Sequence, residues 1–297
     1  MSKQRPSLEF DEPTHTYTCS VVTDGVAEVK TLISASALLG LYKPEFNAEQ
    51  EINKMFDKSE LAHDLEGNQI YLGKKTEYIG MTRQQIKDVW ECNRISKSAY
   101  GTFIHAQAEK YGEELKSGKK SSDIQVVKRP EINQVKKFFK EYTPVSNERQ
   151  IYALLGKENS QSVSDGYGGV AGTIDLLVKD KNGDLWLADW KTNIGKDLAR
   201  QEKRSYESMM NNVLDEVPNT KFWGYALQMS LYRYLLEKTE GIKVKGQFIV
   251  HLIGDRETCP YEEMTQKGQR ISYKQISTPY MEQEIKEVLK DYFVKKQ

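Results

Sequence analysis

The sequence has few cysteines, no long apolar run and no excess of one charge. Its three cysteines, Cys19, Cys92 and Cys259, are far apart and form no CxxC pair, so they cannot make a four-cysteine zinc or iron–sulfur site. No run approaches the roughly 20 apolar residues that span a bilayer, and the start, MSKQRPSLEFDEPTH, lacks the apolar stretch of a secretory signal. We therefore expect no membrane attachment and a cytoplasmic location.

The charges balance, because the 43 Lys and Arg residues equal the 43 Asp and Glu residues in number. This balance gives no sign of the basic excess that many nucleic-acid-binding proteins carry. Basic residues do cluster in two places, and a solvated loop or face explains either cluster as well as a binding role does. The clusters are Lys116, Lys119, Lys120, Lys128 and Arg129, and Lys191, Lys196, Arg200, Lys203 and Arg204.

Several well-known catalytic motifs are also absent. The sequence has no GxxxxGK[ST] loop, no HExxH and no GxSxG, which argues against a P-loop nucleotide hydrolase, a zinc protease of that type and a serine hydrolase. A loose GxGxxA string runs from Gly166 to Ala171. It precedes an expected strand instead of linking a strand to a helix, so it lacks the geometry that cradles a phosphate.

The composition is that of an ordinary folded protein, with 297 residues, 38% hydrophobic residues and 29% charged residues. The first part shows two alternating stretches, 15–22 and 26–32, with Asp24-Gly25 between them, which predict a hairpin. Helical spacing follows over 82–115 and 131–142. Gly101 should mark a break or a close contact between two helices within the first of these ranges.

The most strongly patterned region lies further along the chain. Strands are expected at 149–155, 170–178 and 185–190, and Asn182-Gly183 predicts a tight turn that makes the last two antiparallel neighbours. A helix at 221–237, a strand at 246–253 and a helix near the end of the chain follow. These elements predict an α/β or mixed α+β fold, with a mixed sheet flanked by helices. Without a repeat or a linker, we expect one domain over 1–297.

Two acidic residues in this region occur in apolar strands, where a carboxylate is unfavourable unless it has a partner. Asp175 lies inside an apolar strand, and Asp189 ends the next strand, two residues before Lys191. Since side chains alternate along a strand, Asp189 and Lys191 point to one face, and the hairpin folds them toward Asp175. Carboxylates in an apolar sheet cost several kcal/mol unless they are paired or bind a metal. Mg²⁺ could take both carboxylates and the backbone carbonyl of Trp190. The alternative is a plain Asp–Lys ion pair at a strand end.

Polar residues on two helices could belong to the same site. His105 and Glu109 are four residues apart, so they share one helix face and could both reach a metal. Gln228 and Tyr232 have the same spacing on a later helix. For each pair, an ordinary surface or packing role is an open alternative. Glu148 is a further acidic group near the site or a solvated loop residue.

These motifs, taken in order, resemble the PD-(D/E)XK nuclease superfamily, and within it the RecB-like branch with the QxxxY motif. The chain is similar to stand-alone phage-type exonucleases and to the mitochondrial genome-maintenance exonuclease. The resemblance runs from about 17 to 253, with a catalytic core at about 95–255. The segments that carry it are GTFIHAQAE, AGTID, LADWKTN and QMSLY.

The resemblance implies a role for each of these positions. Asp175 and Asp189 take the places of the motif acids, with Asp instead of the commoner Glu before the motif lysine, Lys191. His105 corresponds to a further metal ligand, and Gln228 with Tyr232 to the pair that orients substrate and lysine. The implied cofactor is Mg²⁺ or Mn²⁺. The cysteine set that anchors an iron–sulfur cluster in some relatives is absent, so we expect no cluster.

The resemblance also implies a function and its partners. We expect a metal-dependent deoxyribonuclease, acting as an exonuclease on single-stranded or frayed DNA ends in replication, recombination or repair. It would act in the cytoplasm of a bacterium or phage-infected host, with any helicase or single-strand-binding protein a separate chain. An insertion at 194–220 would guide single-stranded DNA through phosphate contacts from Lys196, Arg200, Lys203 and Arg204. The alternatives are a structure-specific or nicking endonuclease and a non-catalytic DNA-binding subunit.

Overall fold

The structure is a computed structural model. It describes residues 7–11, 14, 16–23, 26–155, 167–192, 198, 202, 208–254 and 273–293. These residues form two compact units, one made of 1–44 with 104–297 and the other of 45–103. Among the described residues, no helix is both long and apolar enough to cross a membrane.

A mixed sheet of eight strands organises the described part of the first unit. The strand order is β1-β2-β3-β7-β8-β9-β10, and β6 pairs with β7 beside this path. The pairs β3·β7 and β8·β9 are parallel, and the others are antiparallel. This arrangement confirms the expected mixed sheet and its first hairpin. The strands are β1 (Leu8–Asp11), β2 (Thr16–Thr23), β3 (Val26–Ser34), β6 (Thr143–Leu154), β7 (Tyr167–Lys179), β8 (Leu185–Lys191), β9 (Gly246–His251) and β10 (Lys274–Ser277).

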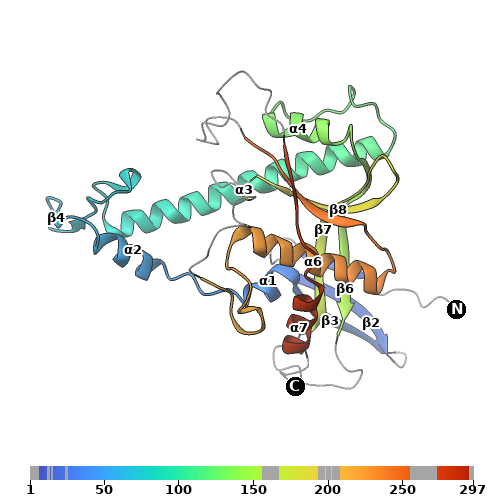
Figure 1. The fold of residues 1–297 in the computed structure, drawn as a ribbon, viewed down its shortest axis with the longest axis horizontal. Coiled ribbons are helices and arrows are strands. Elements are labelled where there is room, and N and C mark those ends of the chain that lie inside the picture. The colour runs from blue at the N-terminus through green and yellow to red at the C-terminus, as the bar shows by residue number, and fades with distance from the viewer. Residues whose placement is uncertain are drawn as a thin grey trace. The chain divides into compact units, whose positions relative to one another are not determined.

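The sheet splits beside β7, which is the feature that positions the site. β6 occupies one edge of β7 along nearly its whole length. On the other edge, β3 pairs only as far as Ala171, and β8 pairs from Leu176 onward. The described pairs therefore leave residues 172–175 without a strand on that edge. Figure 1 shows β3 and β8 beside different ends of β7. Within this gap, Thr173 and Asp175 are half-buried, whereas Gly172 and Ile174 are buried.

The β7–β8 hairpin forms as its turn residues predict. Gly183 has a φ of 83°, a left-handed conformation that glycine adopts without steric cost. The Asp180 side chain accepts hydrogen bonds from the backbone N–H groups of Asn182 and Asp184, at 2.9 and 3.0 Å. These bonds close the turn and set the register in which Leu176 faces Ala188. The local sequence therefore determines which residues of the two strands meet.

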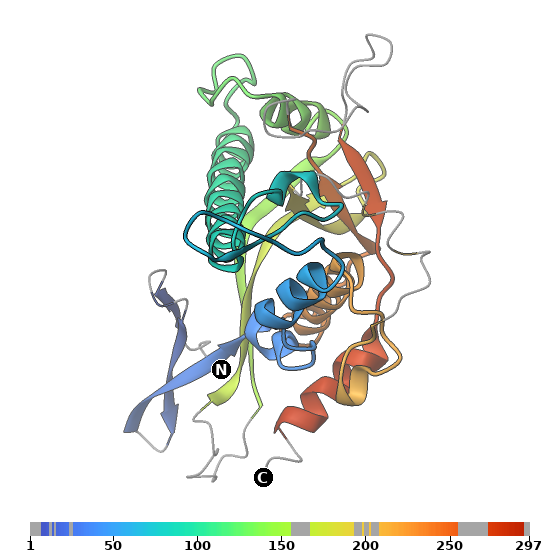
Figure 2. The ribbon, with the colours of Figure 1, turned by 90° about the vertical axis from the view of Figure 1, so that its left-hand side faces the viewer.

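Helices cover the sheet on both sides. α6 (Lys221–Thr239) contacts β6, β7, β8 and β9, and α1 (Ala35–Gly40) and α7 (Glu282–Phe293) pack beside it. Figure 2 shows α6 and α7 on one side of the long strands. α4 (Pro130–Phe138) lies against β8 on the other side, where the Phe138 and Trp190 rings meet at 5.0 Å. Successive side chains of β8 therefore point to opposite faces of the sheet. Trp190 contacts α4 on one face, and Lys191 contacts α6 on the other.

The break that was one of the two alternatives at Gly101 is not found. α3 (Arg83–Lys116) is a continuous helix of 34 residues that passes through Gly101 without a break. A glycine inside a helix costs only about 1 kcal/mol, which the many hydrogen bonds and packing contacts of a long helix outweigh. α4 also ends earlier than its spacing indicated, at Phe138 instead of Tyr142.

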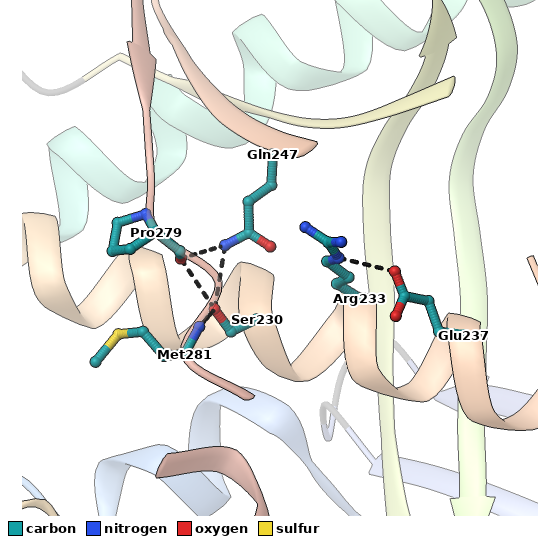
Figure 3. A network of polar contacts seen from close by, with 6 residues as sticks. All are labelled: Ser230, Arg233, Glu237, Gln247, Pro279 and Met281. Carbon is teal, nitrogen blue, oxygen red and sulfur yellow. Dashed lines mark hydrogen bonds and ion pairs between the residues drawn. The ribbon is translucent and has the colours of Figure 1, made fainter. Parts of the chain in front are cut away.

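A buried network of hydrogen bonds connects Pro279 and Met281, which precede α7, to α6 and β9 (Figure 3). The Gln247 amide donates to Ser230 Oγ at 3.1 Å and to the Pro279 carbonyl at 2.9 Å. Ser230 Oγ in turn accepts from the Met281 backbone N–H at 3.0 Å. Because these groups are buried, each bond removes the desolvation cost of its partners. The network fixes the start of α7 against the helix that also lines the site.

The second unit, residues 45–103, has a small core of its own. It contains α2 (Ala48–Phe56), β4 (Ala62–His63), β5 (Gln69–Ile70), the short helix η1 (Thr76–Tyr78) and the first part of α3. Its buried residues are Ile52, Met55, Phe56, Tyr71 and Ile86. No element before residue 82 in this region was predicted from the sequence. Its strands are only two residues long, and the nine-residue helix α2 was missed.

Candidate active site

The β7–β8 hairpin brings the two acidic residues to the split in the sheet. The last described pair of the ladder is Leu176 with Ala188, so Asp175 and Asp189 are the next residues on each strand. The backbone N–H of Trp190 donates to Asp175 Oδ2 at 3.1 Å, which ties the first carboxylate to the strand that carries the second. Asp189 is buried, with 2% of its surface exposed. Two carboxylates therefore share one poorly solvated spot.

The Lys191 side chain lies on the same face of β8 as Asp189 and reaches the two carboxylates. Its Nζ lies 2.5 Å from Asp189 Oδ2. Burial disfavours the charge of Lys191, but the Asp189 and Asp175 carboxylates outweigh burial and raise the pKa of its ammonium above the usual value. The ammonium also lies 4.7 Å from the centre of the Tyr225 ring on α6. Lys191 is thus fully charged and held between a carboxylate and an aromatic face.

His105 approaches the first carboxylate from α3. Its Nδ1 lies 3.4 Å from Asp175 Oδ2. Burial, followed by the positive charge of Lys191, lowers the pKa of the imidazole to about 4, although Asp189 and a backbone hydrogen bond with Trp190 act in the opposite direction. His105 is therefore neutral near pH 7. A neutral imidazole has a free lone pair, which is the form that binds metals.

Glu148 on β6 is closer to the site than a solvated loop residue would be. The β6–β7 ladder pairs Asn147 with Leu176 and Arg149 with Ile174, so Glu148 faces Asp175 across the two strands. Burial first, and then the charges of Asp175, Glu109 and Asp189, raise the pKa of Glu148 to about 8. Its φ of 44° is a left-handed conformation that few residues other than glycine adopt, and it costs about 1–3 kcal/mol. Strain of this kind is concentrated at functional sites.

The pKa values of the other carboxylates at the site are raised as well. Burial and then repulsion from Asp175 raise the pKa of Asp189 to about 6, even though Lys191 opposes both effects. Burial also raises the pKa of Asp175. On α3, the pKa of Glu109 is raised by burial and then by Glu113. One ammonium does not neutralise this group of acids, so a divalent cation would stabilise it further.

The donor set suits a hard divalent ion. Asp175 and Asp189 offer carboxylate oxygens, and His105 offers a nitrogen that Mn²⁺ accepts more readily than Mg²⁺. Among the residues that the structure describes, no three or more His, Cys, Asp or Glu side chains are arranged to enclose a metal ion. Mg²⁺ commonly takes one or two carboxylates and completes its shell with water and phosphate oxygens, so a third protein ligand is not required.

Gln228 and Tyr232 lie beside these acids on α6. The Gln228 amide donates to the Tyr232 hydroxyl at 2.9 Å. Burial and then the charges of Asp175 and Asp189 raise the pKa of Tyr232, so its hydroxyl stays protonated. Tyr232 packs on β7 at Gly172, where an added Cβ would lie 2.4 Å from the tyrosine ring. The glycine of the AGTID segment therefore makes room for this ring.

The structure brings together most of the residues that the sequence indicated. Asp175, Asp189, Lys191 and His105 meet at the end of β8, with Gln228 and Tyr232 adjacent. Four basic residues assigned to DNA contacts, Lys196, Arg200, Lys203 and Arg204, lie outside the described residues. In the described end of the same segment, Met210, Leu214 and Val217 are buried in the main core.

One contact was not anticipated. The Tyr225 ring on α6 lies against Lys191, and none of the sequence motifs gives this residue a role. The position of Tyr225, one turn before Gln228 on the same helix, was the available signal.

The chain belongs to the PD-(D/E)XK nuclease superfamily, whose family pattern matches residues 82–295. Members of this superfamily are nucleases and typically use divalent metal ions such as Mg²⁺. The match includes every residue of the site described above.

Other comparisons add little. The comparison with curated proteins found no match. A solved structure described as "Crystal structure of SSO0001" aligns at 12% identity over 55% of this chain and 55% of that one, with a TM-score of 0.28. The chain thus spans about half the length of that structure, and so weak a likeness carries no argument.

Proposed function

We propose that the protein is a divalent-metal-dependent DNA exonuclease that hydrolyses phosphodiester bonds from single-stranded or frayed ends. The observation that carries this proposal is the meeting of Asp175, Asp189 and Lys191 at one poorly solvated point of a nuclease-family fold. A binding subunit without catalytic activity would gain nothing from burying these charges together, since each costs free energy.

Each residue has a role in the proposed reaction. Asp175 and Asp189 would hold Mg²⁺ or Mn²⁺, with His105 and the Trp190 carbonyl as further ligands and Glu109 as an outer one. When bound, the ion supplies an activated water and neutralises charge on the phosphate. Lys191 would stabilise the negative charge that develops on the phosphate oxygens. Its ion pair with Asp189 and its contact with Tyr225 hold the ammonium in place for this role.

Finer features of the proposal rest on the sequence motifs. The hydrogen-bonded pair Gln228 and Tyr232 supports placement in the RecB-like branch with the QxxxY motif, near the phage-type and mitochondrial exonucleases. Single-stranded DNA would be the substrate in replication, recombination or repair, with a helicase or single-strand-binding protein as a separate partner. The proposed catalytic core covers 95–255 of one nuclease domain, and 194–220 would guide the strand.

Cleavage of end-labelled linear and circular single strands tests this function. Wild type should degrade the linear strand in Mg²⁺ or Mn²⁺ and leave the circle intact, while Asp189→Ala and Lys191→Ala should lose activity. Asp184→Ala is the matched control, because Asp184 and Lys245 form an exposed ion pair 2.5 Å long at the other end of the hairpin. Cleavage of circles would indicate an endonuclease instead. DNA binding by wild type without cleavage in either ion would indicate a binding subunit.

A further inference from the structure

A hollow of about 210 Å³ opens at the split in the sheet, where β3 ends and α1 begins. Gly172 and Thr173 of β7 form part of its wall, and the β1–β2 hairpin contributes Phe10 and Tyr17. No part of the proposed hydrolysis uses this space.

The hollow lies beside the candidate active site. Glu148, Gln228 and Tyr232 also line it. Thr173 is two residues before Asp175 on β7, a distance of about 7 Å along a strand. This separation is similar to the length of one nucleotide in an extended single strand. A strand whose phosphate lies at Asp175 and Asp189 would therefore place a neighbouring nucleotide at the hollow.

The walls combine aromatic rings with uncharged polar groups. The rings of Phe10 and Tyr17 lie 4.5 Å apart at an angle of 31°. The Tyr17 hydroxyl shares a hydrogen bond of 2.9 Å with Thr173 Oγ1, which fixes the pair against β7. On the α1 side, the Ser34 and Ser36 hydroxyl oxygens are 3.2 Å apart. Such walls offer stacking surface and hydrogen-bonding groups to a flat polar ring.

The charge of the lining argues against a phosphate as the occupant. Among the described residues that line the hollow there is no lysine, arginine or histidine, and Glu148 is acidic. The volume corresponds to about seven water molecules at roughly 30 Å³ each, enough for the ring of a nucleobase.

We propose that this hollow binds the unpaired base of the nucleotide next to the scissile phosphate, with the half-buried Phe10 ring as its stacking wall and the buried Tyr17 ring supporting Phe10 from behind. The inference rests on the proposed nuclease function and adds a reason for a single-stranded substrate, since a paired base cannot enter a pocket without leaving its duplex. Phe10 acts as the base-binding residue, Tyr17 positions it, and neither takes part in hydrolysis.

Single strands with one abasic residue at successive positions test the proposal, because an abasic residue keeps its phosphate and lacks only the base. Wild type in Mn²⁺ should cut more slowly, by roughly 5- to 100-fold, when the abasic residue is at one position beside the cut. Phe10→Ala should slow cleavage of the intact strand by a similar factor and become insensitive to that abasic position. Phe10→Leu keeps an apolar side chain against the hairpin core, so it should fold as wild type does and show the same insensitivity.

Val29→Ala is the matched control, since Val29 is on β3, does not line the hollow and is 67% exposed. It should respond to abasic positions as wild type does. Equal cleavage of all abasic strands by wild type would overturn the proposal, and so would Phe10 variants that slow intact and abasic strands by the same factor. If wild type cuts no strand, the proposed function fails, and the affinities of the same strands and variants then decide whether a base is bound.

Discussion

Replacing Glu148 with glutamine should stabilise the metal-free protein at neutral pH. Glu148 faces Asp175 across the β6–β7 ladder, and its pKa is raised from 4.5 to about 8, by burial first and by neighbouring carboxylates next. The folded state therefore binds a proton that the unfolded state has already released. Glutamine has nearly the same shape and no ionisation, so it removes this cost and leaves the backbone conformation unchanged.

The magnitude follows from the pKa shift. Between pH 4.5 and pH 8, the folded protein binds more protons at this site than the unfolded chain, so its free energy of unfolding falls as pH rises. At pH 7 the difference is 7 − 4.5 = 2.5 pH units, or about 3 kcal/mol at 1.36 kcal/mol per unit. Partial exposure of the side chain reduces this to about 2 kcal/mol. Below pH 4.5 both states are protonated and the gain vanishes.

Urea denaturation in EDTA at pH 5, 6, 7 and 8 measures this gain. The stability difference between Glu148→Gln and wild type should grow with pH over this range. Glu216→Gln, a change at an exposed carboxylate, should stay within about 0.5 kcal/mol of wild type at every pH. A Glu148→Gln protein that is no more stable than wild type at pH 7, or is equally stabilised at pH 5 and pH 8, would refute the reasoning.

Three further substitutions test other parts of the structure. Tyr225→Leu should lower kcat by about 3- to 10-fold, because a cation–π contact of 4.7 Å is worth about 0.5–1 kcal/mol or more. Tyr225→Phe keeps the ring and should retain activity. Equal rates for the two variants would exclude a role for the ring. Gly172→Ala should destabilise the protein by about 1–3 kcal/mol in urea denaturation and impair cleavage, because the new methyl group overlaps Tyr232. Gly40→Ala is the control, since its methyl group meets no atom within 4 Å and should show no such clash. Ser230→Ala should cost about 1–3 kcal/mol by leaving the Met281 N–H without its acceptor, and a melting temperature equal to that of wild type would count against the network in Figure 3.

Local rules explain what the sequence predicts well. Asn182-Gly183 determines the hairpin turn, and alternation along β8 places Asp189 and Lys191 on one face, where their charged atoms are 2.5 Å apart. Both features depend on residues close together in the chain, so a pattern read over a few positions is sufficient. The alternative of a break at Gly101 was wrong because a local rule was applied where the whole helix decides the structure. The propensity of one residue was given more weight than the cooperativity of the 34-residue helix that contains it.

The split in the sheet could not be predicted in the same way. The parallel pairing of β3 with β7 joins segments more than 130 residues apart, and no periodicity in either strand indicates which edges meet. The hollow and the contact of Tyr225 with Lys191 depend on that arrangement or on where α6 crosses the strands, and the position of Glu148 opposite Asp175 depends on the register of β6 with β7. The sequence indicated the residue types of the site, and the long-range pairing determines their neighbours.

Binding of Mn²⁺ to the protein in the absence of DNA tests the central claim most directly, because it reports on the carboxylates and does not require cleavage. Calorimetric titration at pH 7 should show saturable binding to wild type and to the Asp184→Ala control, and no binding to Asp175→Asn or Asp189→Ala. Equal Mn²⁺ affinity in wild type and both of these variants would contradict the account.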